Sequence, residues 1–216
     1  MLSIVIPVFN EEENLQTLHT RLTKTLTEQG LDYEIVFVDD GSHDHSPEIL
    51  RRLETEDHRV VVVEFARNFG HQIAISAGLE HSRGRVVSIM DADLQDPPEV
   101  LHTFLAKWQE GWEVVYAVRT ERKEWWGKRL AYAGFYRLLQ RVANIEIPLD
   151  AGDFCVTDRK VVDLLVRMPE RNRFVRGIRS WVGFKQVGVT YERQARHAGT
   201  PKYTLRKLIY LALDGL

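Results

Sequence analysis

Long apolar runs and cysteines are scarce in this sequence of 216 residues. No apolar run reaches the roughly 18 residues that a membrane-spanning helix requires, and the first residues have neither a positively charged stretch nor a small-residue cleavage site. We therefore expect a chain that does not cross a membrane and is not exported. The single cysteine, Cys155, cannot form an intrachain disulfide or a multi-cysteine zinc site, which favours a reducing compartment.

Glycine-rich phosphate-binding turns are also missing. The first expected turn from strand to helix, residues 7–13, contains no glycine, so the G-x-G-x-x-G turn of dinucleotide-binding proteins is not there. The P-loop sequence G-x-x-x-x-G-K-[ST] does not occur in the chain. These absences argue against a Rossmann dehydrogenase and against a P-loop nucleotidase.

The net charge of -2 hides a gradient along the chain. Residues 1–100 hold 8 Lys and Arg against 19 Asp and Glu, whereas residues 171–216 hold 10 against 2. An acidic region binds an anionic ligand only through a metal ion or backbone amides, but a basic region binds phosphate or an anionic surface directly. We expect the two ends to have different roles, and we expect no nucleic-acid binding, because the acidic half would repel a polyanion.

The composition, 44% hydrophobic and 28% charged, is typical of one globular domain. Short β-branched runs alternate with amphipathic helical stretches, which predicts an α/β fold with a mostly parallel, Rossmann-like sheet flanked by helices. The expected strands are residues 2–9, 33–38, 60–65, 86–90 and 113–118. The helices between them should begin after Asn10, at Ser46, near His71 and at Pro97, with Asn10 and Ser46 as N-caps.

The alternation weakens beyond residue 119. The remaining expected elements are a helix at 128–142, an irregular stretch at 144–157, further helix, a strand at 184–191 and a basic amphipathic helix at 203–213. No repeat or Pro/Gly-rich linker divides the chain. One domain with a basic C-terminal helical end is the simplest division.

A D-x-D sequence stands at the expected end of a strand. In an extended segment, residues two apart point the same way, so Asp91 and Asp93 can reach one cation, and the amide oxygen of Gln95 can join them after the chain turns. Such hard oxygen ligands favour Mg²⁺ or Mn²⁺. The alternative is that the two carboxylates only stabilise the turn. A second acidic pair, Asp39 and Asp40, lies at another strand end, where open α/β sheets bind ligands.

Three segments together resemble the family 2 glycosyltransferases of the GT-A fold. They are IVIPVFNE at 4–11, VDDGS at 38–42 and MDADLQ at 90–95. Four more segments are similar to the polyprenyl-phosphate branch of that family, which includes dolichyl-phosphate mannose synthase and the bacterial GtrB-type enzymes that glucosylate undecaprenyl phosphate. These are NFGHQ at 68–72, GDF at 152–154, DR at 158–159 and GTPKY at 199–203.

The resemblance implies roles for individual residues. Those that would bind the nucleotide sugar are Pro7, Val8, Glu11, Asp39, Asp40, Asp91, Ala92 and Asp93. Asp91, Asp93 and Gln95 would hold Mg²⁺ or Mn²⁺ on the diphosphate of the donor. Asp153 would be the catalytic base. Because a phosphate monoester is mostly a dianion at pH 7, Asp153 could instead orient a phosphate acceptor that is already nucleophilic. His71 is a second candidate base, with a capping or packed side chain as its alternative.

The basic end would then bind the phosphate groups of donor and lipid. Eight candidates lie on expected loops and helix starts: Arg119, Arg122, Arg129, Arg173, Arg176, Arg193, Arg196 and Lys202. We favour Lys202 and Arg119, then Arg129 and Arg196. Trp125 and Trp126, beside basic residues, suit a membrane interface or a loop folded onto the core. Cys155 departs from the resemblance, which would place a basic residue there on the acceptor side.

The sequence therefore predicts an inverting, metal-dependent transfer of one sugar from a nucleotide sugar to a polyprenyl phosphate at the cytoplasmic face of a membrane. The resemblance implies UDP-glucose as donor and undecaprenyl or dolichyl phosphate as acceptor. Residues 1–200 would form the GT-A domain, and residues 201–216 a juxtamembrane amphipathic helix. The protein would then be either peripheral or truncated before transmembrane helices. The alternative is a family 2 enzyme acting on a glycan or small hydroxyl acceptor, for which Asp153 would be an obligatory base. The sequence does not decide whether the protein forms a homo-oligomer.

Overall fold

A computed structural model describes residues 1–119, 151–169 and 174–192, which build one sheet with helices on both faces. The seven strands of the described chain are β1 (Leu2–Val8), β2 (Tyr33–Asp39), β3 (Val60–Glu64), β4 (Val86–Ile89), β5 (Val114–Arg119), β6 (Ala151–Asp158) and β7 (Gln186–Tyr191). The helices are α1 (Glu12–Glu28), α2 (Ser46–Glu56), α3 (His71–His81), α4 (Leu101–Gln109), α6 (Arg159–Arg167), α7 (Val175–Trp181) and the short 3₁₀ helix η1 (Pro98–Val100).

The strand order is β3-β2-β1-β4-β6-β5-β7, and every pairing is parallel except those of β6. β1 is flanked by β2 on one side and by β4 on the other, so the chain changes winding direction beside β1. Such switch points lie where ligands bind in open α/β sheets, at the carboxyl ends of the strands. Because β6 runs the other way, its first residues, not its last, reach that edge.

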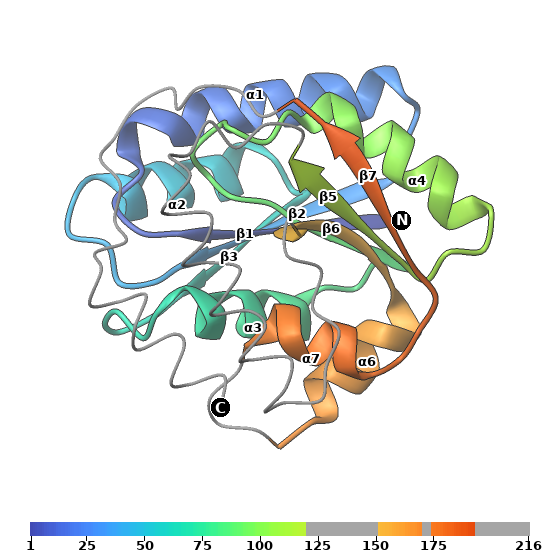
Figure 1. Cartoon of the computed structure of the whole chain (residues 1–216). Coiled ribbons are helices and arrows are strands. Elements are labelled where there is room, and N and C mark those ends of the chain that lie inside the picture. The colour runs from blue at the N-terminus through green and yellow to red at the C-terminus, as the bar shows by residue number, and fades with distance from the viewer. Residues whose placement is uncertain (120–150, 170–173, 193–216) are drawn as a thin grey trace, which may run out of the picture.

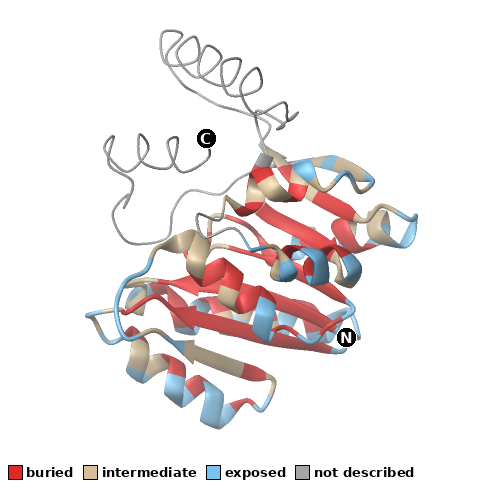
Figure 2. Ribbon diagram, turned by 90° about the horizontal axis from the view of Figure 1, so that it is seen from below, coloured by how far each residue is buried: buried red, intermediate tan, exposed pale blue. Residues whose placement is uncertain are grey.

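Helices lie on both faces of the sheet (Figure 1), and a layer of apolar side chains packs between the helices and the sheet on each face. Helices α1, α2 and α4 cover one face, with Leu18, Leu50 and Phe104 fully buried against it. Helices α3, α6 and α7 cover the other face, where Ile75 and Val161 are fully buried. Strands β1, β2 and β4 are correspondingly buried along their whole length (Figure 2), whereas β3 and β7 are only partly buried. Burial of both faces explains why the strand sequences are continuous β-branched runs.

The expected α/β fold and its five strands are confirmed, but three local predictions are wrong. Residues 151–157 are not irregular: they form most of β6, in which Phe154 and Val156 pack into one apolar layer and Cys155 into the other. Asn10 does not cap α1, because it has a positive φ of 53° and its Oδ1 accepts a hydrogen bond from the His43 backbone N–H.

Ser46 is the first helical residue of α2 and not its N-cap. Its hydroxyl oxygen instead accepts a hydrogen bond from the Glu11 backbone N–H at 2.9 Å, so it joins the starts of two helices. Helix α1 begins one residue after Glu11, at Glu12.

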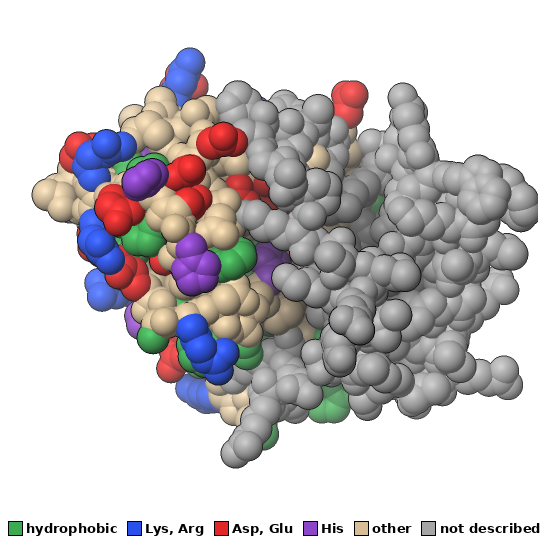
Figure 3. Space-filling view, turned by 90° about the vertical axis from the view of Figure 1, so that its left-hand side faces the viewer, with side chains coloured by type: hydrophobic (Ala, Val, Ile, Leu, Met, Phe, Trp, Pro, Cys, Tyr) green, Lys and Arg blue, Asp and Glu red, His purple; other side chains and the backbone are tan. Residues whose placement is uncertain are grey.

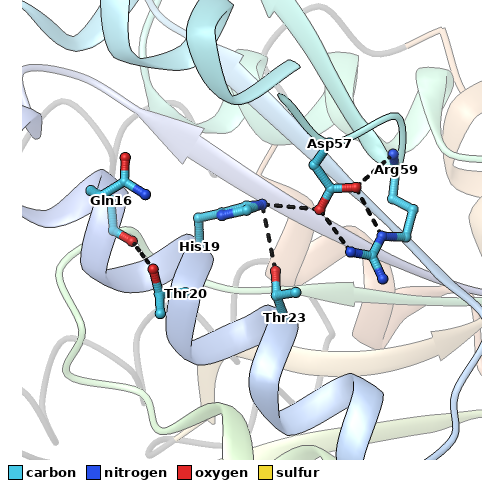
Figure 4. A network of polar contacts seen from close by, with 6 residues as sticks. All are labelled: Gln16, His19, Thr20, Thr23, Asp57 and Arg59. Atoms are coloured by element: carbon cyan, nitrogen blue, oxygen red, sulfur yellow. Dashed lines mark hydrogen bonds and ion pairs between the residues drawn. The ribbon is translucent and has the colours of Figure 1, made fainter. Parts of the chain in front are cut away.

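A polar network ties α1 to the turn between α2 and β3 (Figure 4). The Arg59 guanidinium donates to both oxygens of Asp57, at 2.8 and 3.0 Å, and Nε2 of His19 lies 3.1 Å from Asp57 Oδ2. The hydrogen bond from Arg59, with a further one from His19, outweighs burial and lowers the pKa of Asp57 to about 2. The network lies on α1 and on the turn that precedes β3, so its role is to hold these elements together.

Helix α3 packs very closely on the sheet. A Cβ added to Gly78 would lie 2.2 Å from Cγ1 of Val5 and 3.2 Å from Cγ2 of Val38, so this contact requires glycine. The close packing fixes the helix whose first residues enter the site described below. Within the described ranges, no helix has the length and apolar character needed to span a membrane.

Candidate active site

Four carboxylates predicted as site residues lie at one edge of the sheet. Asp39 is the last residue of β2, and Asp91 and Asp93 follow β4. In the antiparallel pairing of β4 with β6, Ile89 is opposite Cys155, and the same register continued by two residues brings Asp91 beside Asp153. This edge faces the viewer in Figure 3, where acidic and histidine side chains gather on the described surface. The ends of β2 and β4 and the start of antiparallel β6 thus bring residues up to 114 positions apart in the sequence to one edge.

The D-x-D segment makes a tight turn. Asp93 is 6% exposed, and its Oδ1 accepts a hydrogen bond from the Gln95 backbone N–H at 3.1 Å. Leu94, between them, has a positive φ of 61°. The next residue, Asp96, is buried and accepts a hydrogen bond from the Tyr191 hydroxyl of β7. Asp96 is not among the predicted site residues, because in the sequence it is only one more acidic residue of the turn.

Asp91 has a raised pKa, as expected for a carboxyl group close to other acidic side chains. Burial raises its pKa to about 6, and the neighbouring charges of Asp96, Asp153 and Asp93 add to that effect, while His71 opposes it. Negative charge that raises a carboxyl pKa also attracts a cation. Among the described residues, no group of three His, Cys, Asp or Glu side chains is placed to hold a metal ion by itself. Two carboxylates fit Mg²⁺, which is usually bound by one or two carboxylates together with substrate phosphates and water.

Asp153 is held between two basic side chains. The Arg176 guanidinium of α7 donates to both of its oxygens, at 3.0 and 3.3 Å. Nε2 of His71 lies 3.6 Å from Asp153 Oδ2 and 3.7 Å from Asp91 Oδ1, so this ring bridges the two carboxylates. Burial would raise the pKa of Asp153, but Arg176 and His71 outweigh it and hold that pKa well below its ordinary value.

The pKa of His71 is shifted in the opposite direction by the same contacts. Burial would lower the pKa of its imidazole, but contact with Asp153 and the charge of Asp91 outweigh burial and raise that pKa. The structure therefore places His71 between the candidate metal ligand and the candidate base, at the first residue of α3. The capping alternative does not describe its side chain.

The predicted donor-binding residues lie around the ends of β1 and β2. Pro7, Val8 and Ala92 are buried at this edge. Asp39 is 3% exposed, and its Oδ1 accepts hydrogen bonds from the backbone N–H and the hydroxyl of Ser42. Burial raises the pKa of Asp39 despite these donors. Glu11 precedes α1 and accepts a hydrogen bond from the Asn14 side chain at 2.7 Å.

Asp40 points into a loop. Its carboxylate is 3% exposed and accepts hydrogen bonds from the backbone N–H groups of Phe69 and Gly70 and from the Asn68 side chain. Its predicted role beside the nucleotide stays a prediction, but these contacts show that it holds residues 68–70 against the end of β2.

The predicted acceptor-binding residues are mostly outside the described ranges. Arg119, the last residue of β5, is in register with Tyr191 and therefore lies at the carboxyl edge. Beyond the described residues lie Arg129, Arg196, Lys202, Trp125, Trp126 and the expected helices at 128–142 and 203–213. Cys155 follows Asp153 by two residues on β6 and is fully buried in an apolar layer, so its side chain is not exposed to an acceptor. Arg176 was one of eight basic candidates, and no sequence signal set it apart.

Comparisons with known proteins agree with this architecture. The family model for glycosyl transferase family 2 matches residues 3–165. An uncharacterized glycosyltransferase, YkcC of Bacillus subtilis, is 51% identical over 215 residues, which is 99% of this chain and 67% of that protein. The prophage bactoprenol glucosyl transferase homolog of Escherichia coli is 41% identical over 216 residues, all of this chain and 71% of that protein.

Solved structures share the fold. Glucosyl-3-phosphoglycerate synthase of Mycobacterium tuberculosis, solved with Mg²⁺ and uridine diphosphate, has a TM-score of 0.62 and 18% identity, covering 99% of this chain and 75% of that one. The expected GT-A architecture, a mostly parallel sheet with helices on both faces, is therefore confirmed. With the family model matching most of the sequence, the chain belongs to glycosyl transferase family 2.

Proposed function

We propose that this glycosyltransferase moves one sugar from a nucleotide sugar to a polyprenyl phosphate. The observation that carries the proposal is the pairing of two different halves at one edge: the acidic D-x-D turn, and Asp153 held by Arg176 and His71. The first half suits a cation-bound diphosphate, and the second suits an acceptor that needs orientation. The name of the Escherichia coli relative, a bactoprenol glucosyl transferase homolog, supports the lipid class.

The donor half is formed by the ends of β1, β2 and β4. Asp91 and Asp93 would hold Mg²⁺ or Mn²⁺, which supplies positive charge to the leaving diphosphate. Asp39 would lie against the ribose or base, and uridine diphosphate is our proposed carrier, with glucose as the sugar. The related structure with Mg²⁺ and uridine diphosphate supports the carrier only at the level of the fold.

The acceptor half favours a phosphate over a hydroxyl. A sugar hydroxyl must lose a proton to attack, so it requires a base with a useful affinity for that proton. Asp153 has little such affinity, because Arg176 and His71 stabilise its ionised form. A phosphate monoester is mostly a dianion at pH 7 and attacks without a base. The anomeric carbon then exchanges its bond to the diphosphate oxygen for one to the acceptor oxygen, and a single displacement of this kind inverts the configuration.

The membrane assignment follows from the acceptor. A polyprenyl phosphate resides in a bilayer and nucleotide sugars are cytoplasmic, so we propose that the domain works at the cytoplasmic face. Arg119, at the same edge as Asp153, would approach the lipid phosphate together with the basic residues nearer the C-terminus.

Binding of donors tests the first half. Thermal shift and calorimetry with UDP and GDP sugars, with and without Mn²⁺, should give stabilisation by one nucleotide that depends on the metal ion. The same nucleotide should fail to stabilise Asp93→Ala. If no nucleotide binds the wild-type protein under any metal, the proposed function is wrong.

Acceptor choice tests the second half. With the donor identified, undecaprenyl phosphate and undecaprenol are compared at equal concentration in detergent. Transfer to the phosphate alone, with inverted configuration in the product, is expected. Transfer to a hydroxyl acceptor that is abolished by Asp153→Asn would instead establish the alternative in which Asp153 is a base.

A further inference from the structure

The turn that carries the candidate metal ligands has an unfavourable backbone conformation. Leu94, directly after Asp93, has a φ of 61°, in the left-handed region that residues with a side chain rarely adopt. The hydrogen bond inside the turn, from the Gln95 N–H to Asp93, joins only the two neighbours of Leu94. Strained backbone of this kind persists where the surrounding structure holds it. The turn therefore depends on contacts with the rest of the fold.

Two such contacts lie at and just after the strained residue. The Leu94 side chain is buried in the apolar layer between the sheet and helices α1, α2 and α4. The Asp96 carboxylate is 2% exposed and accepts a hydrogen bond from the Tyr191 hydroxyl of β7. Tyr191 and Asp96 stand 95 positions apart, so this bond ties the turn after β4 to the strand at the far end of the sheet.

Tyr191 is a firmly placed donor. Its side chain is buried, and its ring lies edge-on to the Phe154 ring, with 5.8 Å between the centroids. Phe154 directly follows Asp153 on β6, and it packs in turn against Phe104 of α4 at 4.9 Å. The Tyr191 hydroxyl cannot swing away from the turn without opening this aromatic cluster.

Asp96 lies close enough to the candidate metal ligands to affect them. After burial, its charge is the largest of the effects that raise the pKa of Asp91, ahead of the charges of Asp153 and Asp93. A displacement of Asp96 would therefore change both the backbone and the electrostatic potential at the cation site. The partner that fixes Asp96 is thus a partner of the site, although it lies on β7.

We propose that Tyr191 is a positioning residue for the metal turn, residues 91–96, and that it acts through Asp96. The hydrogen bond keeps the turn in its strained form before a cation arrives, so that binding does not have to reshape it. The inference rests on the proposed function, because it takes Asp91 and Asp93 as ligands of Mg²⁺ or Mn²⁺. It adds a residue from the strand that leads into the basic C-terminal region.

Two matched substitutions test the role of the hydroxyl. Tyr191→Phe removes the hydrogen bond and keeps the ring against Phe154. Tyr33→Phe is the control, since the Tyr33 hydroxyl is buried at the opposite end of the sheet, at the start of β2, and has no hydrogen-bond partner within the described ranges. Asp96→Ala and the double variant, Asp96→Ala with Tyr191→Phe, complete a cycle that measures whether the hydroxyl acts through this carboxylate.

Hydrogen exchange of the metal-free protein gives a readout that does not depend on activity. Tyr191→Phe should speed amide exchange in residues 92–96, where the Gln95 N–H bonds to Asp93. Exchange in β2 should stay unchanged, and Tyr33→Phe should leave the turn as it is in the wild type. Unchanged exchange in the turn of Tyr191→Phe, or an acceleration no greater there than in β2, would overturn the proposal.

The affinity for the ion gives the second readout. Mn²⁺ is titrated at a fixed concentration of UDP, or of GDP if UDP does not bind the wild type, and binding is followed by calorimetry. Tyr191→Phe should weaken the apparent affinity for Mn²⁺ about tenfold, as expected when a hydrogen bond to a charged group is lost and part of the protein has a relaxed turn. Tyr33→Phe should not change it. In the Asp96→Ala background, Tyr191→Phe should have less than about a twofold effect.

Transfer rates distinguish positioning from a general loss of stability. The loss of rate in Tyr191→Phe should be largest at low Mn²⁺ and should be mostly recovered at saturating Mn²⁺, because the ion restores the turn. Unchanged Mn²⁺ affinity in Tyr191→Phe would overturn the inference and leave the proposed function standing. Equal effects of Tyr191→Phe with and without Asp96 would do the same. A wild-type protein without metal-dependent nucleotide binding would overturn both.

Discussion

The pH dependence of transfer should follow the acceptor phosphate and not Asp153. Arg176 and His71 hold the pKa of Asp153 well below its ordinary value, so Asp153 is ionised throughout the range in which the enzyme can be assayed. The second pKa of a phosphate monoester is near 6. With saturating donor and Mn²⁺, kcat should therefore be constant above about pH 7. As the acceptor phosphate takes up one proton at lower pH, kcat should fall to about one tenth of its plateau value at pH 5.

Saturation with the metal ion is essential to this experiment. Without metal, burial and neighbouring carboxylates raise the pKa of Asp91 to about 6, so a proton competes with the cation in the same range. An excess of Mn²⁺ displaces that proton and removes Asp91 from the profile of kcat. Below pH 6, the same competition should weaken the apparent affinity for the cation.

Two comparisons identify the titrating group. A phosphonate analogue of the lipid, with a higher second pKa, should move the acid limb upward by the difference between the two acceptors. Asp153→Asn should lower the plateau by about tenfold, as expected for lost orientation, and should leave the limb at the same pH. The reasoning is refuted, and Asp153 is a base, if the fall in kcat at low pH disappears in Asp153→Asn. It is also refuted if that fall occurs at the same pH with both acceptors.

Three other substitutions test the metal site and the fold. Asp93→Ala should abolish stabilisation by nucleotide with Mn²⁺ and leave the melting temperature of the free protein nearly unchanged, as measured by thermal shift. Because Arg59 lowers the pKa of Asp57 from 3.8 to about 2, Asp57→Asn should reduce the free energy of unfolding by about 2 kcal/mol at pH 7. That contribution is present above pH 4 and is lost as the pH falls toward 2, so urea unfolding at both ends should show the difference shrink. Gly78→Ala, whose new methyl would collide with Val5, should cost roughly 1 to 3 kcal/mol in the same assay.

The parallel half of the fold could be predicted because its strands and helices follow local rules. Strands β1 and β2 are buried on both faces, so each appears as an apolar, largely β-branched run between turn residues. Strand β6 lacks that signal, since it begins with Ala151, Gly152 and Asp153 and follows a stretch without clear alternation. Its pairing with β4 and β5 is set by contacts between distant parts of the chain, which no local pattern encodes.

The site divides in the same way. Asp39, Asp91 and Asp93 could be placed together because they follow strands whose carboxyl ends share an edge. Arg176 could not be selected from the basic C-terminal region, because its contact with Asp153 depends on how α7 packs against α3 and β6. The partners of the Asp40 side chain were equally hidden, since D-D at a strand end does not indicate which loop a carboxylate will contact.

The reversed strand explains how two chemically different halves meet. A parallel strand beside β4 would bring its last residue to the edge, directly before a helix start with its own positive dipole. Because β6 is antiparallel, its third residue, Asp153, lies at that edge, where Arg176 of α7 contacts it. The guanidinium of Arg176 can therefore reach both oxygens of Asp153. The edge thus offers two positively charged positions, a cation expected at Asp91 and Asp93 and the guanidinium of Arg176 on Asp153, and a transfer between two phosphate groups can use both.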